Sequence, residues 1–213
     1  MTKADDGSVF DRDCRACPRL AAFLDDVKAK YPDYYCRPVP PFGDAGARLL
    51  VVGLAPGLHG ANRTGRPFTG DHAGILLYEM LHQFGFSTRQ ESEAADDGLE
   101  LVNARITNAV KCLPPENKPV GAEVNTCNAY LANELSALEP GSVVLALGGI
   151  AHKAIIRALG LRQADYKFGH DALHDLGDAY LLDSYHCSRY NTNTGRLTRD
   201  MFEAVFAKAK DLL

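Results

Sequence analysis

The sequence lacks any long apolar segment. Its longest apolar run lies near Val143 to Ala151, far short of the roughly 20 residues that a membrane-spanning helix needs. Residues 1–14 are polar and charged and contain no apolar core of a signal peptide, which takes about 7 to 15 residues. We therefore expect no membrane association and a cytoplasmic location.

An excess of positive charge is also missing. The 23 Lys and Arg residues are outnumbered by 27 Asp and Glu, for a formal net charge of −4. This balance excludes a globally basic protein that coats nucleic acid and leaves room for a local basic surface. Hydrophobic residues at 46% and charged residues at 23% are near the globular average. Without internal repeats or low-complexity tracts, residues 1–213 are expected to form a single domain.

Apolar, β-branched runs alternate with segments of helical periodicity. The predicted strands are 49–54, 101–107, 143–147 and 180–184, and the predicted helices are 74–84, 121–138, 151–159 and 197–213. This order predicts the α/β class, as a three-layer α/β/α sandwich with a mostly parallel four-stranded central sheet. The acidic stretch 91–100 has no apolar periodicity at its start and is expected to be a solvated loop.

Each predicted strand is followed by a segment rich in polar residues and glycine. These segments are GLAPGLHGANRTGRPFTGD, NAVKCLPPENKP, GGIAHK and YHCSRYNTNTGR. Ligands of parallel sheets bind beyond the carboxyl ends of the strands, so we expect the segments to meet at one site. The first has neither the G-x-G-x-x-G spacing of a dinucleotide fingerprint nor the G-K-[ST] ending of a P-loop.

Four of the six cysteines form two groups, Cys14 with Cys17 and Cys112 with Cys127. The C-x2-C spacing lets two thiolates face one ion, and a second pair completes a four-thiolate shell for zinc or an iron–sulfur cluster. Spacing alone does not separate these two. The alternative is a chance C-x2-C pair with Cys112 and Cys127 in the core. Cys36 and the remaining Cys187 are expected to pack in the core.

Three of the motifs carry a resemblance to a known family. GLAPGLHGANRTGRPFTGD, TNAVKCLPPENKP and YHCSRYNTNTGRLT, with the four cysteines in register, resemble the uracil-DNA glycosylase superfamily, in particular its family 5 (the UDGb type). The match runs from Cys14 to about Thr198. It implies a hydrolase that cleaves the N-glycosidic bond of uracil, hypoxanthine or xanthine in DNA and leaves an abasic site for base excision repair.

The resemblance also implies a cofactor and a partner. The four cysteines would hold a [4Fe–4S] cluster of structural role, which would bring Lys111 and Lys118 near the DNA-facing edge. The partner is DNA that contains deaminated bases, bound by a monomer that is associated with the nucleoid through that DNA.

Three residues are expected to carry catalysis. Asp71 matches the aspartate proposed to act in family 5, although a Thr-Gly-Asp sequence before a helix also reads as an N-cap. Asn108 would accept from uracil N3–H and donate to O4. His186 would donate to the base O2 as negative charge collects there. Phe68 would stack under the flipped base, which a glycosylase must first extrude from the duplex.

The remaining site residues line the base or contact the DNA backbone. The backbone of Gly53, Ala55 and Gly57 would approach the base. Ser188 would donate to a phosphate, Arg189 would bind DNA, and Tyr190 would act as a wedge in the duplex. The sequence departs from the family pattern at Cys187, where proline is usual. Leu54 stands where other families carry a water-activating side chain.

Two other functions remain open at this point. One is an iron–sulfur nucleic-acid-binding protein without catalysis, and the other is an α/β enzyme that acts on a free phosphorylated metabolite. Residues 57–70 and 186–199 contain arginines and no acid, so both loops are expected to form a small basic face toward DNA.

Overall fold

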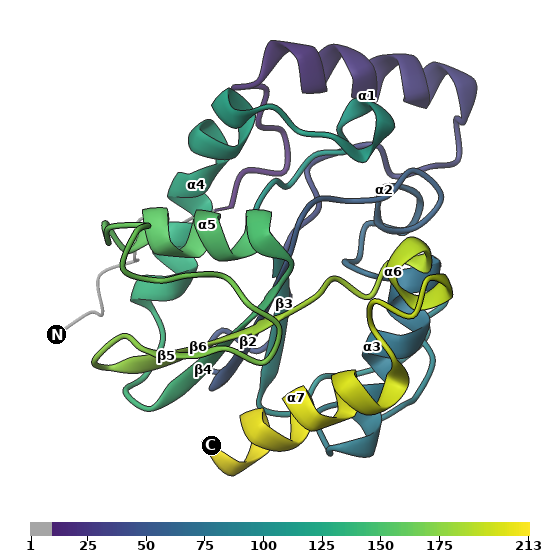
Figure 1. The fold of residues 1–213 in the computed structure, drawn as a ribbon. Coiled ribbons are helices and arrows are strands. Elements are labelled where there is room, and N and C mark those ends of the chain that lie inside the picture. Colours follow the sequence, from purple (N-terminus) through teal and green to yellow (C-terminus); the bar gives the residue numbers. More distant parts are fainter. Residues whose placement is uncertain (1–9) are drawn as a thin grey trace, which may run out of the picture.

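The computed structural model describes residues 10–213; the first nine residues of the expected domain lie outside it. Figure 1 shows a sheet with helices on both faces. The strands are β1 (Phe42–Gly43), β2 (Leu49–Gly53), β3 (Ala104–Asn108), β4 (Ser142–Leu147), β5 (Leu173–Asp175) and β6 (Ala179–Ser184). The helices are α1 (Pro18–Lys30), α2 (Ala61–Thr64), α3 (His72–Gln83), α4 (Gly121–Ser136), α5 (Gly149–Ala158), α6 (Arg189–Asn193) and α7 (Arg199–Asp211), with a 3₁₀ turn η1 (Pro115–Asn117).

The sheet has six strands in the order β1-β3-β2-β4-β6-β5. The inner four, β3, β2, β4 and β6, are parallel and coincide with the four predicted strands within three residues at each end. The expected count of four is a small error, because β1 and β5 add antiparallel edges. These edges are two and three residues long, too short to give a hydrophobic period.

Side-chain alternation along the strands divides the core into two layers. Leu49 and Val51 of β2 face α3 and α7, whereas Leu50 and Val52 face α4 and α5. Figure 1 shows these two helix pairs on opposite faces of the sheet. The predicted α/β/α sandwich is therefore confirmed. Among residues 10–213, no helix is long and apolar enough to cross a membrane.

Helix α1 packs apart from both layers. Its apolar side chains at Leu24 and Val27 contact Leu113 and Cys36 in a small third cluster. Proline at the first helical position begins the helix because its fixed φ suits that position and its missing N–H has no partner there anyway. α1 thereby covers the loops that follow β2 and β3.

The acidic stretch 91–100 is only partly a solvated loop. Its base is joined like a hairpin, since Thr88 N–H donates to the carbonyl of Glu100 at 2.9 Å and Val102 N–H donates to the carbonyl of Phe86 at 2.9 Å. Leu99 is buried in the core, and Asp97 is mostly buried. The acidic composition of a segment predicts exposure to solvent only where its carboxylates have no partner inside the fold. Asp97 has such a partner in Arg66.

Candidate active site

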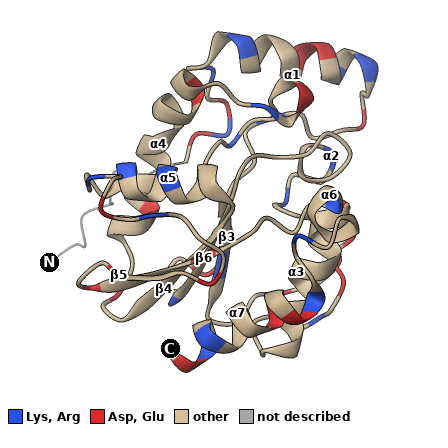
Figure 2. Cartoon of the chain, viewed as in Figure 1, with Lys and Arg blue, Asp and Glu red and all other residues tan. Residues whose placement is uncertain are grey.

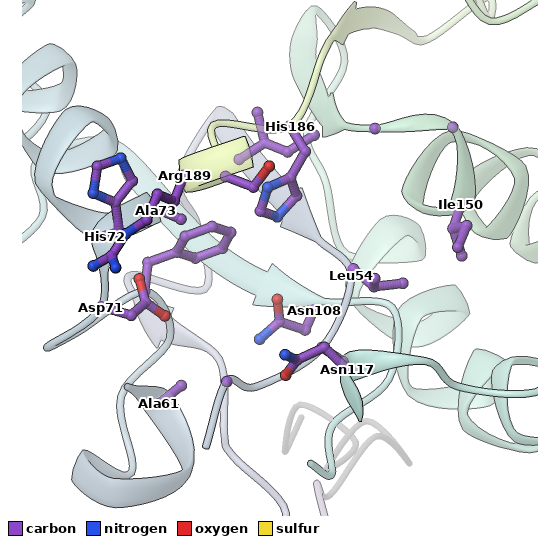
Figure 3. Close-up of a pocket in the computed structure, with 17 residues that line it drawn as sticks. Leu54, Ala61, Asp71, His72, Ala73, Asn108, Asn117, Ile150, His186 and Arg189 are labelled. Atoms are coloured by element: carbon purple, nitrogen blue, oxygen red, sulfur yellow. The ribbon is translucent and has the colours of Figure 1, made fainter. Parts of the chain in front are cut away.

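A cavity of about 500 Å³ lies at the carboxyl edge of the parallel strands. The segments after β2, β3, β4 and β6 all contribute to its wall (Figure 3). Of the predicted site residues, the cavity is lined by Ala55, Gly57, Phe68, Asp71, Asn108, His186, Ser188 and Arg189. The sequence motifs thus meet at one place, as the parallel topology requires.

Gly53 does not line the cavity but lies directly behind two side chains of its floor. It pairs with Asn108 across β2 and β3, and a Cβ on Gly53 would lie 2.5 Å from Asn108 Oδ1 and 2.5 Å from Phe68 Cζ. Phe68 itself has a left-handed backbone with φ of 54°, a conformation that costs an L-residue about 1–2 kcal/mol. Only glycine at position 53 lets this strained Phe68 and Asn108 pack side by side.

Asn108 offers an open hydrogen-bond acceptor to the cavity. Its side chain is 3% exposed, and Oδ1 has no hydrogen-bond partner among residues 10–213. Buried side-chain acceptors in proteins nearly always have a donor. The orphaned oxygen therefore marks a place where a ligand N–H fits.

Asp71 serves as the N-cap of α3 and also faces the cavity. Oδ1 accepts from the Gly74 N–H at 2.9 Å, which confirms the cap that its sequence context indicates. A Cβ on Gly60 would collide with the Asp71 carboxylate, so the glycine makes room for it. Burial raises the pKa of Asp71, opposed by backbone N–H donors. Asp71 can cap α3 and face the cavity at once, because the cap uses Oδ1 and the carboxylate has a second oxygen.

His186 is a neutral, partly buried imidazole at the cavity wall. Burial lowers its pKa to about 4, so the ring carries no charge at neutral pH. It lies near the Phe68 ring, with centroids 6.0 Å apart and planes inclined by 28°. The Asn191 amide donates to the His186 carbonyl at 2.7 Å. This bond fixes the turn that presents the imidazole.

Cys187 stabilises the same turn from inside. Its side chain is fully buried, and Sγ lies 3.4 Å from the Ala73 carbonyl in the first turn of α3. Burial raises the pKa of the thiol, which keeps it protonated as a donor. The thiol thus joins the His186 turn to the helix that Asp71 caps, in place of the stiffness that proline would give.

The rim of the cavity carries the predicted DNA contacts. Ser188 caps α6, where its Oγ accepts from the Asn191 N–H at 3.4 Å, leaving the hydroxyl proton free to donate. Arg189 lines the cavity. Tyr190 is outside it and is 72% exposed, which is the position that a wedge requires.

Two lining residues with polar side chains, Asn117 and His72, were missed by the sequence reasoning. Asn117 has a left-handed φ of 57°, and Figure 3 shows its amide facing the cavity from the side of Asn108. The sequence PPENKP could have indicated this turn, since asparagine adopts a left-handed backbone more readily than most residues. His72 also lines the cavity, and its Nε2 lies 3.0 Å from Thr192 Oγ1. This contact links the start of α3 to α6.

The expected basic face is smaller than the sequence indicated. Arg66 is buried in an ion pair with Asp97, and Arg199 is paired with Glu79 at 3.0 Å. Figure 2 shows acidic and basic residues interspersed along α7 rather than a basic stripe. Of the arginines in the two loops, only Arg189 lies at the cavity rim on α6.

The expectation for Lys111 is also wrong. Its side chain is 1% exposed and its ammonium lies 2.6 Å from Glu134 Oε1. Lys118, in contrast, is exposed, with a surface partner in Glu116. The buried Lys111 ammonium, paired with a carboxylate, is out of reach of DNA.

The four predicted metal-binding cysteines line one cavity of about 230 Å³ between α1, α4 and the loop after β3. Burial first, and then the neighbouring thiols, raise the pKa of Cys112 to about 12. The Lys111 N–H lies 3.3 Å from Cys127 Sγ. Four sulfurs around one cavity, with an N–H donor aimed at one of them, fit a tetrathiolate metal group. Cys36 is buried and receives the Asn62 amide at 3.4 Å, in keeping with its expected packing role.

Comparison with known proteins places the chain in a family. A sequence model of the uracil DNA glycosylase superfamily matches residues 40–210. The chain is 48% identical to a type-5 uracil-DNA glycosylase of Thermus thermophilus over 93% of both proteins. It is 44% identical to one of Pyrobaculum aerophilum, over 92% of this chain and 87% of that protein. A third, from Mycobacterium tuberculosis, is 42% identical over 93% and 78%. The chain belongs to the uracil DNA glycosylase superfamily.

Proposed function

We propose that this protein hydrolyses the N-glycosidic bond of uracil in DNA and leaves an abasic site. One observation carries the proposal. The open acceptor of Asn108 lies beside the ring of Phe68, in a cavity whose wall also holds neutral His186 and the Asp71 carboxylate. The relatives that match nearly the whole chain are named as uracil-DNA glycosylases, which supports the same reaction.

Base recognition follows from the floor of the cavity. A flipped uracil would stack on Phe68 while its N3–H donates to Asn108 Oδ1 and its O4 accepts from the Asn108 amide. Cytosine has no hydrogen at N3 and an amino group at position 4, so it would leave Asn108 unsatisfied. A buried unpaired polar group costs about 1–3 kcal/mol, and this cost discriminates against undamaged cytosine.

Bond cleavage separates charge across the site. As the bond between C1′ and N1 breaks, negative charge collects on the base and the sugar becomes oxocarbenium-like. His186 would donate to O2, and because the ring is already neutral it does so over the whole neutral range. The Asp71 carboxylate would stabilise the sugar cation or orient the attacking water. Both interactions are strengthened by the low dielectric of a buried cavity.

The cavity also favours bases other than uracil, and we extend the proposal to hypoxanthine and xanthine. Leu54, Ala55 and Ala61 line it with apolar surface. This apolar part of the wall leaves no hydrogen-bonding group of its own unpaired when a different base enters, so it rejects the larger purines only weakly. Asn108 selects uracil over cytosine, and the apolar part of the wall lets the other deaminated bases enter.

A [4Fe–4S] cluster is proposed as the occupant of the thiol cavity. Cys14, Cys17, Cys112 and Cys127 would be its ligands. The group would supply a covalent link between the N-terminal segment, the loop after β3 and α4. Because Asn108 and Cys112 are four residues apart, that link would also steady the end of β3 where the base is read.

The direct test uses oligonucleotides that contain one uracil, hypoxanthine or xanthine, with undamaged DNA as the control. We expect release of the free base from the modified oligonucleotides and none from the control. Binding without release would favour a nucleic-acid-binding protein that lacks catalysis. Cleavage of a free nucleotide but not of DNA would favour an enzyme of phosphorylated metabolites.

A further inference from the structure

The turn of residues 66–70, which carries Phe68, is joined to a distant segment by a buried ion pair. Arg66 Nη2 lies 2.5 Å from Asp97 Oδ2, and the two side chains are 4% and 15% exposed. The same guanidinium donates to the Ala94 carbonyl and, through Nε, to Thr69 Oγ1 at 3.1 Å. One cation therefore joins both ends of the turn to residues 92–97, which we call the strap.

Two further bonds join the turn to the strap. Thr69 Oγ1 lies 2.7 Å from Ser92 Oγ, and the Gly70 N–H donates to the Ser92 carbonyl at 3.2 Å. The guanidinium of Arg66 also lies over the Phe42 ring, 4.7 Å from its centroid. The turn is thus connected both to the strap and to Phe42.

Asp97 organises the strap itself. Its carboxylate accepts backbone N–H groups from Glu93 at 2.9 Å, Ala94 at 3.3 Å and Leu99 at 2.9 Å. Desolvation is outweighed by Arg66 and these donors, which lower the pKa of Asp97 to about 2. The strap therefore presents a permanent negative charge to Arg66 at any working pH.

The turn needs such support because its backbone is strained. Phe68 has a left-handed φ of 54°, which is unfavourable for a residue with a side chain, and strained residues persist only where their surroundings fix them. The carbonyl of Phe68 lies so close to Gly74 that a Cβ there would collide with it. A loosened turn would move the Phe68 ring and the adjoining Asp71 together.

We propose that Arg66 and Asp97 are positioning residues for base release, which hold Phe68 beneath the flipped base and Asp71 at the cavity wall. Neither residue lines the cavity, so they act through the turn and not on the substrate. The inference rests on the proposed glycosylase function and adds to it a link between the catalytic turn and a segment about 30 residues away.

The test compares Arg66→Met, Arg66→Lys and Asp97→Asn with the wild type. Arg162→Met is the matched control, since it removes an exposed arginine that is paired with Asp165. Single-turnover release of uracil gives the rate, and binding to abasic product DNA gives the affinity. For Arg66→Met we expect a rate lower by ~10²-fold, as for a misplaced catalytic group, with affinity within about twofold of wild type. Arg66→Lys keeps the charge and should recover part of the rate.

A double-mutant cycle separates positioning from a general structural role. In a Phe68→Leu background, Arg66→Met should lower the rate much less than in the wild type, because the ring that it positions is gone. If Arg66→Met does not fold, Asp97→Asn takes its place in the cycle with Phe68→Leu. Thermal unfolding of each variant fixes an assay temperature at which all variants are folded. Additive losses, or a rate that follows unfolding alone, would overturn the inference.

The outcomes also separate this inference from the function on which it rests. A wild-type protein that releases no base overturns the proposed function. An active wild type whose Arg66→Met and Asp97→Asn variants match the Arg162→Met control overturns the positioning role alone.

Discussion

Asp71 has two tasks, capping α3 and facing the cavity, and Asp71→Asn separates them. The asparagine amide oxygen can still accept the Gly74 N–H that Asp71 accepts at 2.9 Å, and Asn and Asp are about equal as N-caps. The carboxylate charge, however, is lost. The substitution should therefore leave the helix intact and abolish the electrostatic role.

The stability change follows from the pKa. Burial raises the pKa of Asp71 in the folded protein, so the folded state holds this proton more tightly than the unfolded chain. Its ionisation then lowers stability as pH rises between the unfolded and the folded pKa, and the loss is complete above the folded value. At neutral pH a neutral amide should therefore unfold at the wild-type temperature or slightly above it.

The rate should respond differently. Loss of a positioned carboxylate commonly lowers a rate by about 10²- to 10⁴-fold, and we expect that range for single-turnover uracil release by Asp71→Asn. Asp71→Ala is the comparison, since it also removes the cap and should cost about 1 kcal/mol, or about 2–4 °C in Tm for a chain of this size. In the wild type, release should slow on acidification through the raised pKa of Asp71. A wild-type rate in Asp71→Asn would refute the catalytic role and leave Asp71 as a cap only.

Four other predictions concern the rest of the site. Gly53→Ala should lower uracil release by at least ~10²-fold, because the added Cβ displaces the two side chains on the cavity floor. His186 should add no titration to the rate between pH 6 and 9, since its pKa of about 4 keeps it neutral there; His186→Ala should slow release by about 10²- to 10³-fold. Cys112→Ser should reduce bound iron and visible absorption in the purified protein. Tyr190→Ala should weaken release from duplex DNA more than from single strands.

Three of these changes have a matched control. Gly121→Ala adds a Cβ with nothing within 4 Å and should leave the rate unchanged, while Cys36→Ser alters a cysteine outside the thiol cavity and should keep the iron. Tyr190→Phe retains the ring and should behave as the wild type. Equal iron in both cysteine variants, or equal losses on both DNA forms for Tyr190→Ala, would contradict the corresponding assignment.

The central sheet could be predicted because its strands are fully buried. The five residues of β2, for example, are all buried, and such continuous apolar runs between glycines are readable from sequence. The edges β1 and β5 were missed, since a strand of two or three residues shows no period. α1 was not predicted, although its buried residues Leu20, Ala21, Leu24 and Val27 have helical spacing.

The catalytic motifs were readable because parallel strands bring their carboxyl ends together. What the sequence could not show is which charges are paired. The sequence predicted Arg66 and Lys111 as cations near DNA. In the fold, Arg66 lies 2.5 Å from Asp97 and Lys111 lies 2.6 Å from Glu134. Partners separated by 23 or 31 residues are set by tertiary structure, so local composition overestimated the basic face.

The most direct test of the account is a stoichiometric assay on one uracil-containing oligonucleotide. Free uracil and abasic sites should be measured in the same reaction, the first by chromatography and the second by strand cleavage with alkali. Hydrolysis at this cavity predicts equal amounts of the two products with the wild type and a sharply reduced yield of both with Asp71→Asn at equal time. Abasic sites without free uracil, or neither product from a folded wild-type protein, would contradict hydrolysis at this cavity.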